Sequence, residues 1–321
     1  MKILLTTTSY QDTPGKHHQM LEESGHEVIR ARGPLTEEQM LEIIRTQGPF
    51  DGFLHGDDHL TRKVIEAALP SLRALSKYGI GLDSVDVKAA TDLKVPVLFT
   101  PGVNHTTVAE HTFGLLIALA KHMVPHINAV GEGTWKRMTG SELAGKTIGV
   151  MGMGRIGKEV AKRARAFDMN VLGFDVYWDD AFARQYEVTR CWKAEELICK
   201  ADIVSLHMNL SDDNRGYFNT ERIGMMKKGA MILNCARGGL VVEEDIVEAC
   251  KSGQLGGYAT DVLDVEPMKV PHVFQGVANI LVTPHIGSRT FESVERQALM
   301  STENLLRVLA GVKPLAQANS F

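Results

Sequence analysis

The sequence predicts an α/β protein of two domains, each built on a parallel sheet. Three observations predict this fold. Apolar strand-like runs alternate with amphipathic helix-like segments along most of the chain, as in successive βαβ units. A glycine-rich turn near residue 152 joins such a strand to such a helix. The length of 321 residues exceeds what one hydrophobic core usually serves, so two cores are expected.

The first hundred residues predict five strands and four helices. Each aliphatic run predicts a strand, and residues that favour helix ends bound the segments between the runs. Thr36 is a predicted N-cap, and Gly25, Gly48 and Pro70 mark helix ends. In chain order we expect strands at 2–8, 26–31, 51–56, 72–79 and 95–102, and helices at 15–25, 36–48, 61–70 and 86–94.

The rest of the chain predicts a helix, a second α/β series and a final helix. Residues 106–130 are mostly apolar and predict one long helix, suited to a buried connector between domains or to a subunit interface. The second series begins at the glycine-rich turn and continues to about residue 285. Residues 291–311 predict an amphipathic helix with which the chain could return to the first domain.

Composition and charge narrow the functional classes. With 44% hydrophobic and 23% charged residues, the chain is typical of globular proteins. A formal net charge of −4 argues against nucleic acid or an anionic membrane as the main partner. The first apolar run is too short for a signal peptide, and no run reaches the roughly 18 residues that span a bilayer. We therefore expect a cytoplasmic protein.

The cysteines indicate neither a metal site nor a disulfide framework. They form no CxxC pair and show no zinc-ligand spacing, so we expect them to be reduced and buried, and we expect no metal. The four are Cys191, Cys199, Cys235 and Cys250.

A dinucleotide-binding turn is the clearest motif. Gly152-x-Gly154-x-x-Gly157 follows the predicted strand 147–151 directly and precedes a helix. The first glycine allows a tight turn, the second lets the backbone approach a pyrophosphate, and the third lets the helix pack on the strand. A nucleoside-binding methyltransferase is an alternative, although its glycine pattern is typically looser.

Asp175 predicts which dinucleotide is bound. It ends the next predicted strand, 18 residues after the last glycine, where a carboxylate binds the adenosine ribose hydroxyls. A carboxylate repels a 2′-phosphate, and the residues that follow, VYWDD, supply no arginine for one. The sequence therefore favours NAD over NADP.

Three later strands are each followed by ionisable residues. They are followed by Arg237, by Asp261 or Glu266, and by His285. Ligands bind at the carboxyl ends of strands in a doubly wound sheet, so these side chains are expected to converge near the nicotinamide. A lone histidine at a strand end is more often a hydrogen-bonded loop residue, and only its combination with the other groups favours a catalytic role.

The motifs together resemble the D-isomer-specific 2-hydroxyacid dehydrogenase family, which includes phosphoglycerate dehydrogenases and glyoxylate and hydroxypyruvate reductases. The resemblance covers nearly the whole chain. It rests on the glycine turn and on KYGIGLDSVDV at 77–87, PGVNHTTVAEHTFGLL at 101–116, NCARGGLV at 234–241, DVLDVEP at 261–267 and TPHIGS at 283–288.

The resemblance implies a fold and a set of site residues. It implies a Rossmann NAD-binding domain at 101–290, a smaller flavodoxin-like substrate domain at 1–100 and 291–321, and a homodimer formed through 106–130 and the segment with Trp135. The implied catalytic residues are Arg237, Glu266 and His285, and the implied substrate contacts are Lys77, Gly79, Ile80 and Asn104. The implied cofactor contacts are Gly152, Gly154, Arg155, Ile156, Gly157, Asp175, His207, Ala236, Asp261 and Gly287.

Physical chemistry is consistent with the implied catalytic roles. Reduction of a 2-keto acid needs a hydride at C2 and a proton at the carbonyl oxygen, which an imidazolium at His285 can supply. Glu266 should raise the pKa of that histidine and fix its tautomer. Arg237 offers a planar fork that matches a carboxylate. Structural roles stay open: Arg237 on cofactor phosphates, Glu266 in a surface turn, and His207 and Asn104 as local hydrogen-bonding residues.

One loop departs from the family pattern and bears on the substrate. Many relatives have Arg-Ser-x-Thr where this chain has HGDD at 55–58. Loss of the cation at His55 and gain of Asp57 and Asp58 should disfavour a dianionic substrate. We therefore expect a small unphosphorylated 2-hydroxy acid such as glycerate, with D-3-phosphoglycerate as the alternative. A different class also stays open, an NAD-sensing corepressor-like binding protein.

Overall fold

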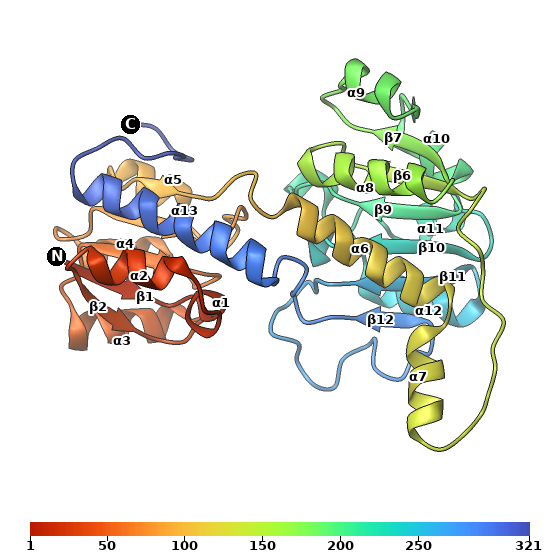
Figure 1. Ribbon diagram of the computed structural model, residues 1–321, viewed down its shortest axis with the longest axis horizontal. Coiled ribbons are helices and arrows are strands. Elements are labelled where there is room, and N and C mark those ends of the chain that lie inside the picture. Colours follow the sequence, from red (N-terminus) through yellow and green to blue (C-terminus); the bar gives the residue numbers. More distant parts are fainter. The chain divides into compact units, whose positions relative to one another are not determined.

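The computed structural model describes all residues, 1–321, and they form two compact units (Figure 1). Unit 1 comprises Met1–Asn104 and Arg289–Phe321, and unit 2 comprises His105–Ser288. The sequence placed these divisions after residues 100 and 290. Both units are parallel α/β folds, as the sequence predicts.

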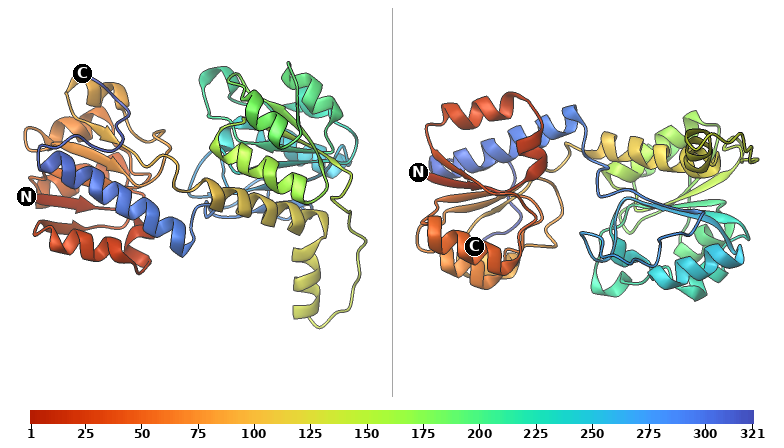
Figure 2. Two further views of the ribbon diagram at one scale, coloured as in Figure 1. Left: turned by 45° about the horizontal axis from the view of Figure 1, so that its top comes forward. Right: turned by 90° about the horizontal axis from the view of Figure 1, so that it is seen from below.

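Unit 1 is a five-stranded parallel sheet in the order β2-β1-β3-β4-β5, with helices on both faces (Figure 2). Residues alternate along β1: Ile3 and Leu5 pack toward α2 and α13, and Leu4 packs toward α3 and α4. The strands are β1 (Lys2–Leu5), β2 (Glu27–Arg30), β3 (Gly52–His55), β4 (Ala74–Lys77) and β5 (Val97–Leu98). The helices are α1 (Thr8–Asp12), α2 (Lys16–Glu23), α3 (Glu37–Gln47), α4 (Arg62–Ala68), α5 (Val87–Asp92) and α13 (Phe291–Leu309).

The predicted elements of unit 1 are confirmed, with one omission. Thr36 caps α3 through a capping box, in which its hydroxyl accepts from the Gln39 amide at 3.3 Å. The omission is α1, which begins at Thr8, the last residue of the predicted strand 2–8. The strand ends at Leu5, Thr7 is the N-cap of α1 and Thr8 is its first residue, so the end of the threonine run belongs to the helix.

Unit 2 is a seven-stranded parallel sheet in the order β12-β11-β10-β9-β6-β7-β8. Helices α6 and α8 cover one face, and α10, α11 and α12 cover the other. The strands are β6 (Thr147–Met151), β7 (Asn170–Phe174), β8 (Val188–Arg190), β9 (Ile203–Leu206), β10 (Ala230–Asn234), β11 (Leu255–Thr260) and β12 (Ile280–Val282). The helices are α6 (His105–Ala120), α7 (Met123–Gly131), α8 (Arg155–Ala166), α9 (Asp180–Gln185), α10 (Ala194–Lys200), α11 (Thr220–Gly224) and α12 (Glu243–Ser252).

The single long helix predicted at 106–130 is wrong. Residues of this range form α6 and α7, which are bent by 67° relative to each other. The chain turns at His122, whose φ of 52° lies in the left-handed region. Pro125 then falls in the first turn of α7, where its missing N–H is tolerated. Helix α6 is largely buried, whereas α7 has no buried residue, so only α6 acts as the expected buried element.

No single helix passes a test of length and hydropathy for crossing a membrane, and the bent pair α6 and α7 passes only when taken together. The expectation that all four cysteines are buried is partly wrong. All are free thiols, and Cys191 and Cys250 are buried, but Cys235 is half-buried and Cys199 is exposed on α10.

Candidate active site

The glycine-rich turn between β6 and α8 has the geometry that its three glycines require. Gly152 has a φ of +96°, which favours glycine. A Cβ at Gly157 would lie 1.9 Å from the carbonyl oxygen of Gly152, so helix and strand approach too closely for any side chain. A Cβ at Gly154 would meet no protein atom within 4 Å. Space is therefore open above the backbone where a pyrophosphate would approach the N-terminus of α8.

Asp175 lies beside this turn because β7 is the neighbour of β6. Its carboxylate accepts hydrogen bonds from the amides of Met153 at 2.5 Å and Tyr177 at 2.8 Å. The first bond ties the carboxylate to the glycine turn itself. The open space at Gly154 and this adjacent carboxylate fit a dinucleotide with ribose hydroxyls.

His207 follows β9 and packs against the same turn. A Cβ at Gly152 would lie 2.5 Å from the His207 carbonyl oxygen. The ring Nε2 lies 2.8 Å from the Ser205 hydroxyl, and Nδ1 is buried without a partner. Burial lowers the pKa of His207 to about 3, so the ring is neutral near pH 7 and is unsuited to donate a proton as a cation. Contact with the cofactor stays a prediction.

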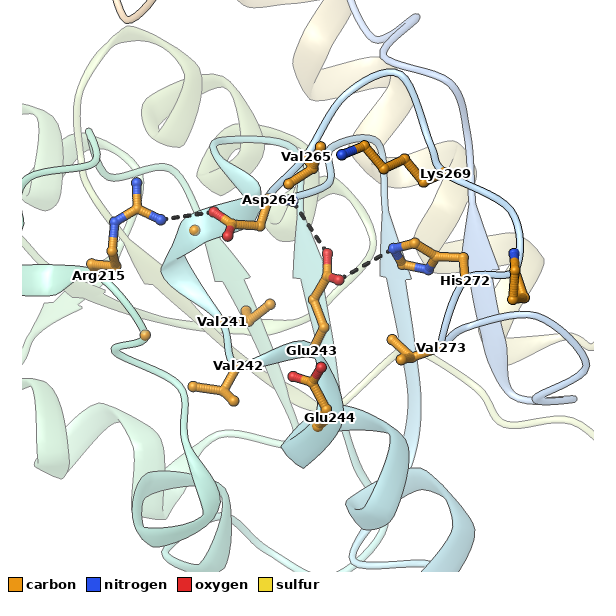
Figure 3. Close-up of a pocket in the computed structure, with 13 residues that line it drawn as sticks. Arg215, Val241, Val242, Glu243, Glu244, Asp264, Val265, Lys269, His272 and Val273 are labelled. Carbon is orange, nitrogen blue, oxygen red and sulfur yellow. Dashed lines mark hydrogen bonds and ion pairs between the residues drawn. The ribbon is translucent and has the colours of Figure 1, made fainter.

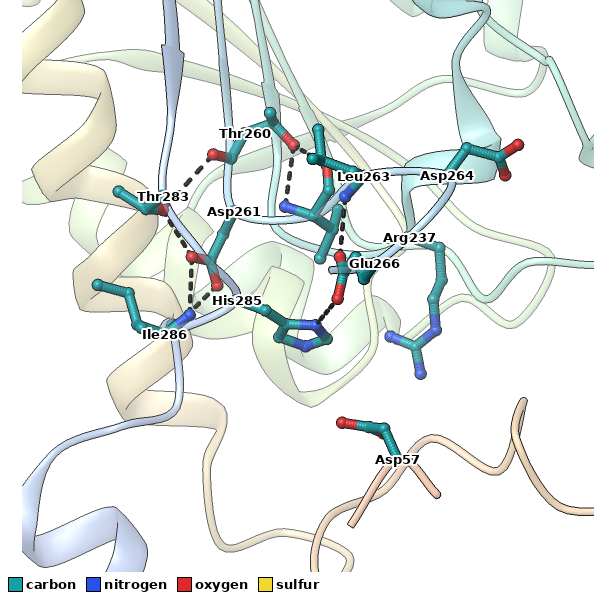
Figure 4. Close-up of polar contacts among 12 residues, drawn as sticks. Asp57, Arg237, Thr260, Asp261, Leu263, Asp264, Glu266, Thr283, His285 and Ile286 are labelled. Carbon is teal, nitrogen blue, oxygen red and sulfur yellow. Dashed lines mark hydrogen bonds and ion pairs between the residues drawn. The ribbon is translucent and has the colours of Figure 1, made fainter. Parts of the chain in front are cut away.

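His285 and Glu266 form a pair at the ends of β12 and β11 (Figure 4). The ring Nδ1 of His285 lies 2.6 Å from Oε2 of Glu266. The other carboxylate oxygen accepts from the Leu263 amide at 2.8 Å, which fixes the carboxylate's orientation. Both side chains keep solvent access, at 46% and 34% exposed, so the pair can reach a substrate.

Asp261 holds the loop that carries His285. Its carboxylate accepts from the Thr283 hydroxyl at 2.6 Å and from the amides of Ile286 at 2.9 Å and Gly287 at 2.6 Å. Burial opposes ionisation of Asp261, but these bonds and one from His111 outweigh it and hold the pKa below its usual value. A Cβ at Gly287 would lie 2.8 Å from this carboxylate, so the loop closes tightly only with glycine there.

His111 is a residue of this network that the sequence did not single out. It lies on α6, with Nε2 at 2.9 Å from the Thr283 hydroxyl and 3.3 Å from the Asp261 carboxylate. The position falls inside the stretch PGVNHTTVAEHTFGLL, but no local pattern predicts a partner about 150 or more residues away.

Arg237 follows β10 and lies on the same side of the sheet as the histidine pair (Figure 4). The Asn234 amide donates to the Arg237 carbonyl at 2.9 Å, and Asn234 Oδ1 accepts from the Ala236 amide at 3.1 Å. One guanidinium nitrogen of Arg237 donates to the Ala236 carbonyl at 2.7 Å. The structure thus brings Arg237, Glu266 and His285 together at the carboxyl ends of β10, β11 and β12.

The predicted substrate contacts lie in unit 1. Lys77 ends β4 and is 3% exposed, with its ammonium bound to the Asp57 carboxylate at 2.5 Å and to the Gly56 carbonyl at 2.6 Å. Gly79 has a φ of +124°, and its amide donates to the Thr100 hydroxyl at 3.0 Å. Ile80 is 38% exposed. Asn104 Oδ1 is buried without a partner. Substrate contact stays a prediction for all four.

The sequence suggested that the HGDD loop presents its side chains to the substrate, but two of its residues point into the interior of unit 1. His55 and Asp58 are both fully buried. Burial, with the charge of Lys77, lowers the pKa of His55 to about 3. The Asp58 carboxylate accepts from the Thr6 hydroxyl at 2.5 Å and the Leu35 amide at 2.8 Å, so it stabilises the loop internally. Only Asp57 of the two carboxylates is exposed.

Comparison with known proteins identifies the family. Residues 113–287 match the family model described as the NAD binding domain of D-isomer specific 2-hydroxyacid dehydrogenases. The chain belongs to this family. Residues 113–287 of this family member are therefore a NAD-binding domain. Contact of Gly154 and Asp175 with the cofactor stays a prediction.

Similar proteins cover this dehydrogenase family member almost completely. It is 38% identical over 313 residues to a D-3-phosphoglycerate dehydrogenase of Methanocaldococcus jannaschii. The matched residues are 97% of this chain and 58% of that relative. It is 37% identical over 295 residues to a glyoxylate reductase of Thermofilum pendens, covering 89% of the chain and 85% of the relative. The crystal structure of the TT0316 protein from Thermus thermophilus superposes with a TM-score of 0.90 at 36% identity, covering 99% of this chain and 100% of that one. The chain thus spans little more than half of the first relative.

Proposed function

We propose that the protein interconverts a small D-2-hydroxy acid and its 2-keto acid with NAD. The observation that carries the proposal is the 2.6 Å pair of His285 and Glu266, which stands beside Arg237 at the strand ends of a NAD-binding domain. An acid/base, a carboxylate that orients it and a cation for the substrate are the groups that this reaction needs.

Each residue has a defined task in the proposed reaction. NAD, when bound, would accept the hydride that leaves C2 of the hydroxy acid. His285 exchanges a proton with the substrate oxygen through the ring nitrogen that does not face Glu266. Glu266 stabilises the imidazolium and fixes its tautomer. The Arg237 guanidinium binds the substrate carboxylate and polarises the adjacent C–O bond. Asp261 keeps the His285 loop in place.

The proposed substrate is unphosphorylated, such as glycerate and its keto acid. The support is the Lys77 ammonium, the buried cation of the predicted substrate contacts, whose charge is already balanced by Asp57 at 2.5 Å. A phosphate group on the substrate would have to compete with the Asp57 carboxylate for this ammonium. The name of the relative from Methanocaldococcus jannaschii makes D-3-phosphoglycerate the alternative substrate.

We further propose a cytoplasmic homodimer. The support is the segment of α7 and the loop after it, where large apolar side chains are exposed. A monomer rarely leaves so many together. They are Met123, Val124, Ile127, Val130, Trp135 and Met138.

The test is oxidation of NADH in the presence of a panel of 2-keto acids, with NADPH in parallel. The panel includes glyoxylate, hydroxypyruvate and phosphohydroxypyruvate, and both product enantiomers are assayed in the reverse direction. Turnover of an unphosphorylated acid with NADH, to the D-product, is the expected result. Binding of NADH with no turnover on any acid would overturn the enzyme function and favour a NAD-sensing role.

A further inference from the structure

The segment 264–272, which carries Glu266, buries few of its own apolar side chains. It follows β11, and residues 264–271 are all exposed. Val265 is 52% exposed and Val270 is 73% exposed, so neither anchors the segment in a core. Glu266 must nevertheless be held within hydrogen-bond distance of His285. The position of the segment therefore depends on polar anchors.

Glu243, the first residue of α12, binds the segment at both ends (Figure 3). One carboxylate oxygen accepts from the Asp264 amide at 3.2 Å. The other lies 3.2 Å from Nε2 of His272. The side chains of His272 and Glu243 are only 13% and 16% exposed, so solvent screens their interaction less than it screens a surface pair. Glu243 thus ties together two points that flank Glu266.

Asp264 is fixed a second time by Arg215 and by the backbone after Arg237. Its carboxylate accepts from the Arg215 guanidinium at 2.7 Å (Figure 3). A Cβ at Gly239 would lie 2.9 Å from that carboxylate, and a Cβ at Gly238 would lie 1.9 Å from the Leu263 carbonyl carbon. The peptide between Leu263 and Asp264 therefore lies directly on Gly238, and the Asp264 carboxylate lies against Gly239.

The catalytic carboxylate is bound immediately beside this peptide. The Leu263 amide, which belongs to the peptide just before Leu263–Asp264, donates to Glu266 Oε1 at 2.8 Å. A shift of Leu263 together with Asp264 therefore moves the carboxylate away from His285. We propose that Glu243 is a positioning residue, which sets Glu266 against His285 by holding Asp264 and His272. The inference rests on the proposed function, because it takes His285 as the acid/base.

The kinetic test compares Glu243→Ala with Glu244→Ala. Glu244 is the exposed neighbour on the same helical turn, and the Asp264 amide binds Glu243 and not Glu244. We expect Glu243→Ala to lower kcat/KM by roughly tenfold to a hundredfold and to leave NADH affinity unchanged. Glu244→Ala should stay within about twofold of the wild type. Glu243→Gln keeps an oxygen acceptor for the Asp264 amide and should recover part of the loss.

Two further readouts separate positioning from general stability. The pH profile of kcat/KM in Glu243→Ala should move toward that of Glu266→Gln. The double variant Glu243→Ala/Glu266→Gln should be little slower than Glu266→Gln alone, since both changes act through the contact of Glu266 with His285. Additive losses with an unshifted pH profile would overturn the proposal.

Limited proteolysis tests the tether without any turnover. Lys269 is an exposed trypsin site inside the segment. Trypsin should cleave there faster in Glu243→Ala than in Glu244→Ala or the wild type. If the wild type reduces no keto acid, the proposed function fails, but the cleavage rates still show whether Glu243 holds the segment 264–272 in place. Equal cleavage rates in the three proteins would overturn it.

Discussion

His285 and Glu266 meet through a 2.6 Å contact between the ring Nδ1 and Oε2, although 18 residues separate them in the chain. They follow adjacent parallel strands, β12 and β11, whose carboxyl ends lie at one edge of the sheet. A carboxylate at this distance favours the imidazolium and decides which ring nitrogen faces the substrate. Nε2 is therefore the atom that exchanges the proton in the proposed reaction.

Removing either partner of this pair should act on turnover more than on cofactor binding. We expect His285→Ala to lower kcat by about 10²–10⁴-fold, the usual contribution of a general acid or base. Glu266→Gln should cause a smaller loss and shift the pH profile, because the amide keeps a hydrogen-bonding group but loses the charge. Steady-state kinetics with NADH titrations measure both effects. Near-normal kcat in His285→Ala would exclude it as the acid/base.

The glycine turn offers a matched pair of variants. Gly157→Ala places a methyl group 1.9 Å from a backbone oxygen and should destabilise unit 2 by about 1–3 kcal/mol. Gly154→Ala meets no protein atom within 4 Å and should cost less than about 1 kcal/mol. The same methyl group enters the space left for the pyrophosphate, so NADH affinity should fall. Thermal unfolding and NADH fluorescence titration check this pair. Unchanged NADH binding in Gly154→Ala would place the cofactor elsewhere.

Asp57 should decide between phosphorylated and unphosphorylated substrates. Asp57→Ser removes the carboxylate that balances Lys77. The ratio of kcat/KM for phosphohydroxypyruvate to that for hydroxypyruvate should then rise by about tenfold, which corresponds to one charge interaction near the surface. Asp58→Asn is the control, since Asp58 is buried and bonded within the loop, and it should lower stability without raising the ratio. An unchanged ratio in Asp57→Ser would separate Asp57 from substrate choice.

Much of this fold follows from local sequence. Strand runs, caps such as Thr36 and the glycine turn are properties of short segments, and the rule that parallel strand ends meet at one edge already groups Arg237 with Glu266 and His285. What the sequence does not show depends on contacts between distant segments. The Asp58 carboxylate, for example, is bound by Thr6 and Leu35, which lie 52 and 23 residues away in the sequence. The contacts of His111 and Glu243 are of the same kind.

The turn between α6 and α7 escaped prediction for a local reason. Only two polar residues, Lys121 and His122, separate the apolar residues of α6 from those of α7, and so short a polar stretch also occurs within single helices. The turn depends on one left-handed residue, His122, and on a proline that suits a helix start as well as a helix break. A histidine in that conformation has no reliable sequence signal, and the exposed side chains of α7 cannot be told from buried ones by composition alone.

Stability should fall on acidification because His55 and His207 are buried as neutral rings. The pKa of each is lowered to about 3 in the folded protein, by burial and, at His55, by the charge of Lys77, whereas an unfolded histidine titrates near 6.5. Between these values the unfolded chain binds protons that the folded chain does not. Their contribution is therefore complete above about pH 6.5 and is lost as the pH falls toward 3, at up to about 1.4 kcal/mol per pH unit for each ring.

The unfolding free energy, measured by denaturant titration from about pH 7 to about pH 5, checks this slope. Nε2 of His55 is buried without a partner, so protonation would place an unpaired charge in the interior of unit 1. His55→Gln should accordingly flatten the slope. His59→Gln should leave it as in the wild type, because His59 is exposed in the folded protein. Equal slopes in His55→Gln and the wild type would mean that the His55 ring is charged, or reaches water, in the native state.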